Sequence, residues 1–127
     1  MALRVLIIDD SELILQMLAM VCQGAGYTVE ILAQFPLVAA CLERASFDVV
    51  ITDLNLPDVP GNDTVAALRT YPQLATTPIV IISGQPRATL NTIASERGAQ
   101  GALSKDDGLP AIASELPAMI ARLAAGD

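Results

Sequence analysis

Histidine is absent from the 127 residues of this sequence, and several kinds of chemistry are excluded with it. Ser-His-Asp and Cys-His nucleophile systems and zinc-protease motifs all need an imidazole. A phosphohistidine relay on this chain is excluded for the same reason. Aromatic residues make up only 3% of the sequence, so the core must be aliphatic, and stacking platforms for single-stranded nucleic acid are missing.

Basic residues are also scarce. Seven Lys and Arg residues stand against fourteen Asp and Glu residues, which gives a formal net charge of -7. An acidic domain repels phosphate backbones, so direct nucleic-acid binding is not expected. The apolar runs are too short to span a membrane, and residues 1–4 lead into a strand-like run without a basic region and cleavage site. We therefore expect a cytoplasmic protein that contacts no membrane.

Cysteine occurs only twice, as Cys22 and Cys41. Both lie within apolar stretches, and they do not form a C-x-x-C motif. The sequence predicts that they are small buried hydrophobes in a reducing compartment, rather than a disulfide or a redox pair.

Short apolar runs rich in branched residues alternate along the chain with segments of helical spacing. Apolar runs without alternation are typical of strands that are covered on both faces. The predicted strands are residues 5–8, 29–32, 49–51, 79–82 and 101–103. The predicted helices are residues 13–21, 37–44, 62–70, 89–97 and 109–123, the third after a turn at residues 58–61. Pro117 should kink or split the last helix.

A strand followed by a helix, repeated five times, predicts parallel strands joined by right-handed crossovers. The expected fold class is α/β, a three-layer sandwich with the sheet in the middle. Linkers, low-complexity segments and internal repeats are not visible. We expect residues 1–127 to form a single domain, with no output domain in this chain.

Polar residues follow four of the predicted strands at the edge where such sheets bind ligands. Asp9 and Asp10 follow the first strand, Asp53 the third, Ser83 the fourth and Lys105 the fifth. Each residue has a simpler explanation: a helix cap for the acidic pair, a turn for Ser83, the start of a loop for Asp53 and a random surface position for Lys105. The coincidence of all five at one edge favours a functional site.

The residue types at this edge suit phosphoryl transfer. Crowded carboxylates repel one another, and a hard divalent cation such as Mg2+ removes that cost, so Asp9, Asp10 and Asp53 predict a metal site. Lys105 is the only lysine in the sequence, which favours a position that needs a compact ammonium group. Asp53 could become an acyl phosphate, with Lys105 and the metal neutralising the phosphoryl oxygens and Ser83 donating a hydrogen bond to one of them.

Four motifs stand in order along the chain: VLIIDDS at residues 5–11, ITDLNLP at residues 51–57 with Gly61, IISG at residues 81–84, and GAxGxLSK at residues 98–105. Together they resemble the receiver domains of bacterial two-component response regulators, over essentially the whole sequence. The resemblance implies a flavodoxin-like (βα)5 fold with strand order 2-1-3-4-5.

The resemblance also implies a role for each site residue. Asp53 would be the phosphoacceptor and a metal ligand. Asp10 would bind Mg2+ directly, Asp9 would act mostly through water, and the backbone carbonyl of Asn55 would be a further ligand. Ser83 and Lys105 would sense the phosphoryl group. The side chains of Asn55 and Gln85 match positions that tune the lifetime of the phosphoryl group in this family.

Two positions depart from the pattern of receiver domains. Ala102 stands where receivers usually carry Tyr or Phe, an aromatic side chain that changes orientation on activation. Asp106 stands where most receivers have a proline in a cis peptide. Both departures leave open how a signal would travel from the site.

The expected function is a receiver domain that accepts a phosphoryl group from a partner histidine kinase or histidine phosphotransfer protein and signals through a changed surface. It would catalyse only its own phosphorylation and dephosphorylation, and a homodimer is left open. Alternatives are a docking module with a degenerate site, and a receiver cut from a larger regulator or hybrid kinase. A phosphatase with an aspartate nucleophile is a further alternative, although Asp53-Leu54-Asn55 lacks the second acid of its usual Asp-x-Asp motif.

Overall fold

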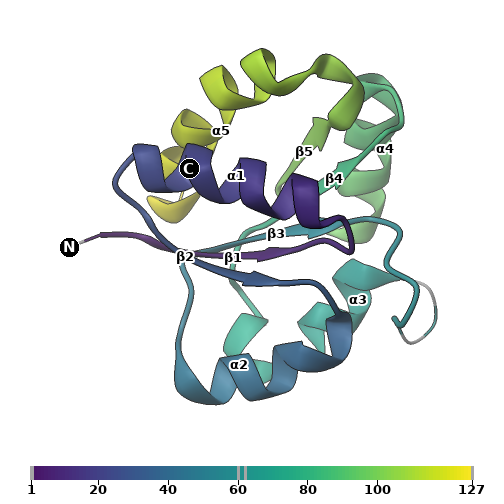
Figure 1. Ribbon diagram of the computed structural model, residues 1–127. Helices are drawn as coiled ribbons and strands as arrows, with labels where there is room; N and C mark the ends of the chain where they lie inside the picture. The colour runs from purple at the N-terminus through teal and green to yellow at the C-terminus, as the bar shows by residue number, and fades with distance from the viewer. Residues whose placement is uncertain (1, 60, 62, 127) are drawn as a thin grey trace.

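A parallel five-stranded sheet forms the centre of the computed structural model, which describes residues 2–59, 61 and 63–126 (Figure 1). The strands are β1 (Arg4–Ile8), β2 (Thr28–Leu32), β3 (Val49–Asp53), β4 (Ile79–Ser83) and β5 (Gly101–Ser104). Their order is 2-1-3-4-5, as predicted. The order reverses between β1 and β3, which is where a sheet of this kind leaves a crevice at its carboxyl edge.

Helices cover both faces of the sheet and complete the three predicted layers. They are α1 (Glu12–Gly24), α2 (Val38–Arg44), α3 (Thr64–Arg69), α4 (Arg87–Arg97) and α5 (Leu109–Ala124). Figure 1 shows α1 and α5 together on one side of the sheet, with α2 and α3 on the other. Side chains of α4 pack into the same core as those of α2 and α3. Asn62, the predicted start of the third helix, and Pro60 in the turn before it lie outside the described residues.

The central strands β1, β3 and β4 are mostly apolar because both of their faces are buried, whereas the edge strand β2 includes Glu30 and is partly exposed. In β1, Val5 and Ile7 pack into the core under α1 and α5, whereas Leu6 and Ile8 pack into the opposite core. The sheet thus separates two mainly aliphatic cores, one on each face, in keeping with the scarcity of aromatic residues.

Both cysteines are buried as free thiols, which confirms the predicted burial without a disulfide. Cys22 belongs to the core under α1 and α5, and Cys41 to the core on the other face of the sheet. Burial raises the pKa of the Cys22 thiol to about 11, so this group stays protonated near neutral pH.

The last helix runs without a break from Leu109 to Ala124, so it is not split at Pro117, and the alternative of a kink stays a prediction. Leu116 and Ile120 are buried on either side of the proline and hold both halves of the helix on the sheet. Packing of this stripe outweighs the backbone hydrogen bond that proline cannot donate. Among the described residues, no helix has the length and apolar character needed to cross a membrane.

The predicted ends of β3, β4 and β5 need correction, since β5 extends to Ser104, and short 3-10 helices were missed. Asp53 and Ser83 are the last residues of β3 and β4 rather than the first residues after them. Beyond β5, the chain forms a 3-10 helix at Lys105–Asp107, where the sequence predicted only a strand end. This turn fixes the direction in which Lys105 leaves the sheet.

Candidate functional site

The three predicted carboxylates come together at the carboxyl edge of β1 and β3. One oxygen from each of Asp9, Asp10 and Asp53 lies within 4.8 Å of the others, and the three belong to the part of the chain that the structure describes. Asp9 and Asp53 are buried, whereas Asp10 is exposed. Burial of two like charges is costly unless a cation compensates for them.

The acidic pair does not serve as the cap of α1, which was the simpler explanation for it. Ser11 is the N-cap residue, and its Oγ accepts a hydrogen bond of 3.4 Å from the Ile14 N–H. The Asp9 Oδ1 atom accepts a hydrogen bond of 2.8 Å from the Ser11 N–H. The cap therefore fixes the loop and leaves Asp10 and the second Asp9 oxygen available to the site.

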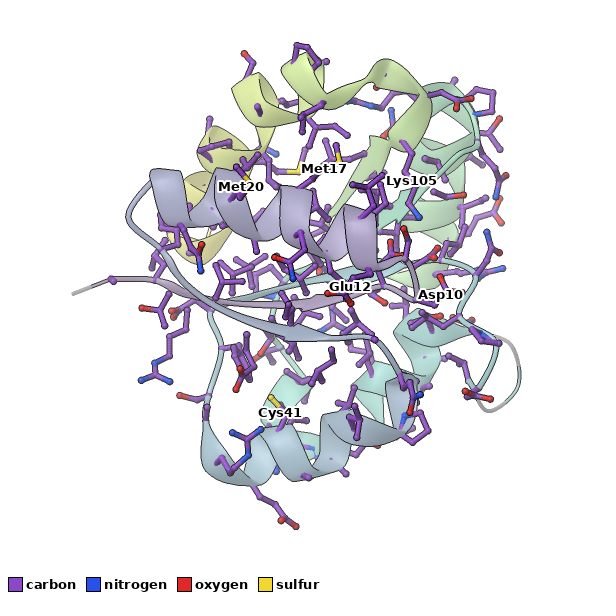
Figure 2. The ribbon with its side chains drawn as sticks, viewed as in Figure 1. Asp10, Glu12, Met17, Met20, Cys41 and Lys105 are labelled. Carbon is purple, nitrogen blue, oxygen red and sulfur yellow. The ribbon has the colours of Figure 1, made fainter. Side chains whose placement is uncertain are left out.

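Lys105 reaches across the edge of the sheet to both buried carboxylates. Its Nζ atom lies 3.0 Å from Asp9 Oδ2 and 3.5 Å from Asp53 Oδ2. Burial by itself would lower the pKa of Lys105, but the contact with Asp9 and the charges of Asp53 and Asp9 raise it overall. Figure 2 shows Lys105 and Asp10 at the same end of the sheet. The only lysine of the sequence thus provides a fixed positive charge at the site.

Asp53 is held at the end of β3 in an environment that disfavours its charge. Its Oδ1 atom accepts a hydrogen bond of 3.0 Å from the Asn55 N–H. Burial raises the pKa of Asp53, and the charges of Asp9 and Asp10 add to the rise, whereas the Asn55 N–H and Lys105 oppose it. Burial, more than the neighbouring charges, therefore makes the ionised form of Asp53 unfavourable.

The environment of one Asp9 oxygen favours a metal ion beside the three carboxylates. Asp9 Oδ2 is buried and forms an ion pair with Lys105 Nζ at 3.0 Å, but no well-directed hydrogen bond from the described residues reaches it. Buried carboxylate oxygens without donors, next to two further carboxylates, are suitable ligands for a hard divalent cation. The side chains of Asp9, Asp10 and Asp53 therefore fit Mg2+. The part assigned to the Asn55 carbonyl stays a prediction.

Ser83 is the last residue of β4, the strand that pairs with β3. Its buried Oγ accepts hydrogen bonds from the Asn55 Nδ2 at 3.5 Å and from the Gln85 N–H at 3.4 Å. Asn55 therefore links Asp53, through its backbone N–H, to Ser83, through its side chain. Both contacts of Ser83 are long, so the hydroxyl is free to turn toward a new partner.

The two departures from the receiver pattern have different structural consequences. Ala102 is 2% exposed and packs in the core shared by α2, α3 and α4, where its methyl group has no rotamer to change. Asp106 lies in the 3-10 helix, and its N–H donates a hydrogen bond of 3.2 Å to Ser104 Oγ. Proline could not make that bond, because it has no N–H.

An ion-pair cluster beside the site was missed from the sequence. Arg87, at the start of α4, donates hydrogen bonds of 2.8 Å from Nη1 to Glu115 Oε1 and from Nη2 to Glu115 Oε2. Its Nη2 also donates to Asp107 Oδ2 at 3.1 Å. No sequence motif marks these residues, which are 20 and 28 positions apart. The cluster joins the start of α4 to α5 and to the Lys105–Asp107 turn.

This ion pair should make stability depend on pH. The hydrogen bond from Arg87, together with its charge and that of Arg122, lowers the pKa of Glu115 below 4.5 despite partial burial. Because the folded pKa is depressed, the stabilisation is present at neutral pH and is lost as pH falls through the folded pKa. We expect Glu115→Gln to lower the free energy of unfolding by about 0.5–1 kcal/mol at pH about 7, and by much less at pH about 3.

Chemical denaturation at both pH values would measure the effect. Glu43→Gln is a matched control, because Glu43 is exposed on α2. An equal loss for Glu115→Gln at the two pH values would contradict the ion-pair explanation.

Comparison with known proteins identifies the family. The family model of the response regulator receiver domain matches residues 5–116. The chain therefore belongs to this family, whose members are the receiver domains of two-component response regulators. Receiver domains take phosphoryl groups from histidine kinases, and they are not enzymes that turn over a separate substrate.

Individual relatives agree with this assignment. The chain is 30% identical to the alkaline phosphatase synthesis transcriptional regulatory protein SphR of Synechococcus elongatus, over 95% of this chain and 50% of SphR. It is 27% identical to the transcriptional regulatory protein BasR of Escherichia coli, over 94% of this chain and 53% of BasR. The chain thus spans about half the length of these curated relatives.

Solved structures share the fold along most of the chain. The chemotaxis response regulator CheY4 of Vibrio cholerae is 33% identical, covers 91% of this chain and 97% of its own, and superposes with a TM-score of 0.77. The receiver domain of the sensor histidine kinase PA1611 of Pseudomonas aeruginosa has a TM-score of 0.80 at 18% identity, covers 98% of this chain and 99% of its own, and shows the likeness of fold alone.

Proposed function

We propose that this receiver domain accepts a phosphoryl group on the carboxylate of Asp53. The observation that carries the proposal is the position of Lys105 Nζ, which lies within 3.5 Å of oxygens of both Asp9 and Asp53. An ammonium group there can neutralise a phosphoryl oxygen as charge develops on it. Asp53 is also the carboxylate held at the end of the central strand, in register with Ile82, the residue before Ser83.

Transfer would form a bond between a carboxylate oxygen of Asp53 and the phosphorus, while the bond from phosphorus to the donor breaks and its electron pair leaves with the donor. Asp9 and Asp10, with the backbone carbonyl of Asn55, would hold Mg2+ beside Asp53. When bound, Mg2+ supplies positive charge to the phosphoryl oxygens. The Lys105 ammonium would bind a phosphoryl oxygen, and the Ser83 hydroxyl would donate a hydrogen bond to the phosphoryl group.

The phosphodonor would be a phosphohistidine on a histidine kinase or a histidine phosphotransfer protein. Residues 1–127 contain no histidine, so the donor imidazole lies outside this sequence. The domain would then catalyse only its own phosphorylation and dephosphorylation. The absence of a second acid in Asp53-Leu54-Asn55 argues against a phosphatase that acts on other substrates.

Incubation of the protein with Mg2+ and a small-molecule phosphodonor such as acetyl phosphate tests this proposal. Intact-mass measurement should show the addition of one phosphoryl group that is stable in acid and labile in base, as expected for an acyl phosphate. Omission of Mg2+ should slow the reaction. Folded protein that gains no mass with Mg2+ and the phosphodonor would overturn the proposal.

A further inference from the structure

A single buried hydroxyl group joins two loops of the site. Ser104 is the last residue of β5 and is 0% exposed. Its Oγ donates a hydrogen bond of 2.7 Å to the Gln85 carbonyl, in the loop between β4 and α4. The same Oγ accepts a hydrogen bond of 3.2 Å from the Asp106 N–H, in the Lys105–Asp107 turn. Within the described part of the chain, no backbone–backbone hydrogen bond joins these two loops, so the hydroxyl connects them.

Gln85 extends this connection to the predicted phosphoryl-sensing residue. The Gln85 N–H donates a hydrogen bond of 3.4 Å to Ser83 Oγ, and its carbonyl accepts the bond from Ser104. A continuous series of hydrogen bonds therefore runs from Ser83 through the backbone of Gln85 to Ser104 and Asp106. If Ser83 turns toward a phosphoryl group, the long contact with Gln85 changes, and the Ser104 bond transmits that change.

We infer that Ser104 is a positioning residue that couples movement of the β4–α4 loop to the Lys105–Asp107 turn. This inference rests on the proposed phosphorylation of Asp53, because phosphorylation supplies the movement. Ala102 cannot provide a rotating side chain in the same strand, so the hydroxyl at the end of β5 supplies an alternative route. The turn that it controls also carries Lys105, which contacts Asp53.

The surrounding contacts favour movement of the two loops as a unit. Ser104 ties them together on the buried side, and the ion pair of Arg87 with Asp107 ties them again nearer the surface. The hydroxyl bond is short and part-buried, and Ser104 itself is 0% exposed, whereas the ion pair is about one-third exposed at each partner. Loss of the buried bond should therefore weaken the coupling more than loss of the ion pair does.

Amide hydrogen exchange tests the link without any phosphorylation. In Ser104→Ala, the Asp106 amide loses its acceptor and should exchange about tenfold faster than in the wild type. Ser104→Thr keeps a hydroxyl group and should restore slow exchange. Ser114→Ala is the matched control, because Ser114 is exposed on α5. Unchanged exchange of the Asp106 amide in a folded Ser104→Ala protein would overturn the link.

A phosphoryl mimic tests the coupling itself. With Mg2+ and beryllofluoride, wild-type protein should show amide chemical-shift changes at Gln85 and also at Asp106 and Asp107. In Ser104→Ala, the change at Gln85 should persist, whereas the changes at Asp106 and Asp107 should fall by at least half. Changes at these two residues that equal those of the wild type would overturn the inference.

A matched pair of variants separates the hydroxyl group from packing. Ser104→Thr and Ser104→Val add side chains of the same shape, and they differ in the hydroxyl group. Thr should preserve the coupled shift changes and Val should lose them, even if Ser104→Ala does not fold. Equal shift changes at Asp106 and Asp107 in the two variants would contradict a role of the Ser104 hydroxyl in the coupling. If the wild type takes up no phosphate from acetyl phosphate, the proposed role of Asp53 fails, but the exchange experiment still decides whether the Ser104 link exists.

Discussion

The Asp53→Asn variant is expected to take up no phosphate from acetyl phosphate and Mg2+, where the wild type gains one phosphoryl group. An amide is a far poorer nucleophile than a carboxylate and cannot form the acyl phosphate. Intact-mass measurement gives the result directly. Asp58→Asn is the control, because Asp58 is an exposed acid in the loop after β3 and should not affect the reaction.

Loss of phosphorylation in Asp53→Asn should not result from unfolding. Burial and the charges of Asp9 and Asp10 raise the pKa of Asp53, so its ionised form is disfavoured in the folded protein. A neutral amide removes that penalty, and the melting temperature should be equal to or above that of the wild type. Phosphate uptake equal to the wild type would show that Asp53 is not the acceptor.

The Asp10→Asn variant should bind Mg2+ at least about tenfold more weakly than the wild type, because it lacks one carboxylate of the cluster. The rate of phosphorylation at limiting Mg2+ should fall together with the affinity. Titration calorimetry or amide chemical shifts would measure the binding. Glu12→Gln controls for the loss of one negative charge near the site, since Glu12 is exposed in the first turn of α1 (Figure 2). Equal Mg2+ affinity of Asp10→Asn and the wild type would exclude Asp10 as a ligand.

The order of strands and helices could be predicted because both faces of the sheet are buried. Runs such as residues 5–8 and 79–82 are apolar throughout, which is a local property of the sequence. The strand ends then indicated where Asp9, Asp10 and Lys105 would meet, since parallel strands share one carboxyl edge. The rule that ligands bind at the carboxyl ends of parallel strands and the four sequence motifs thus predicted a site at the same edge of the sheet.

Element boundaries were less predictable because they depend on pairing between distant segments. Asp53 belongs to β3 because it lies in register with Ile82 of β4, and no local feature of the sequence indicates this. The 3-10 helix at Lys105–Asp107 is capped by Ser104, whose side chain could equally have formed an ordinary turn.

The sequence by itself determined the fold class, the family and the residue types at the site, because apolar runs and strand-end residues are local patterns. Only the tertiary structure decided which groups bond to one another. The Ser104 hydroxyl reaches a carbonyl 19 residues away, and Arg87 reaches a carboxylate 28 residues away. Such contacts depend on the order β4–β5 and on the packing of α5 beside it, since these bring together loops that the chain itself keeps apart.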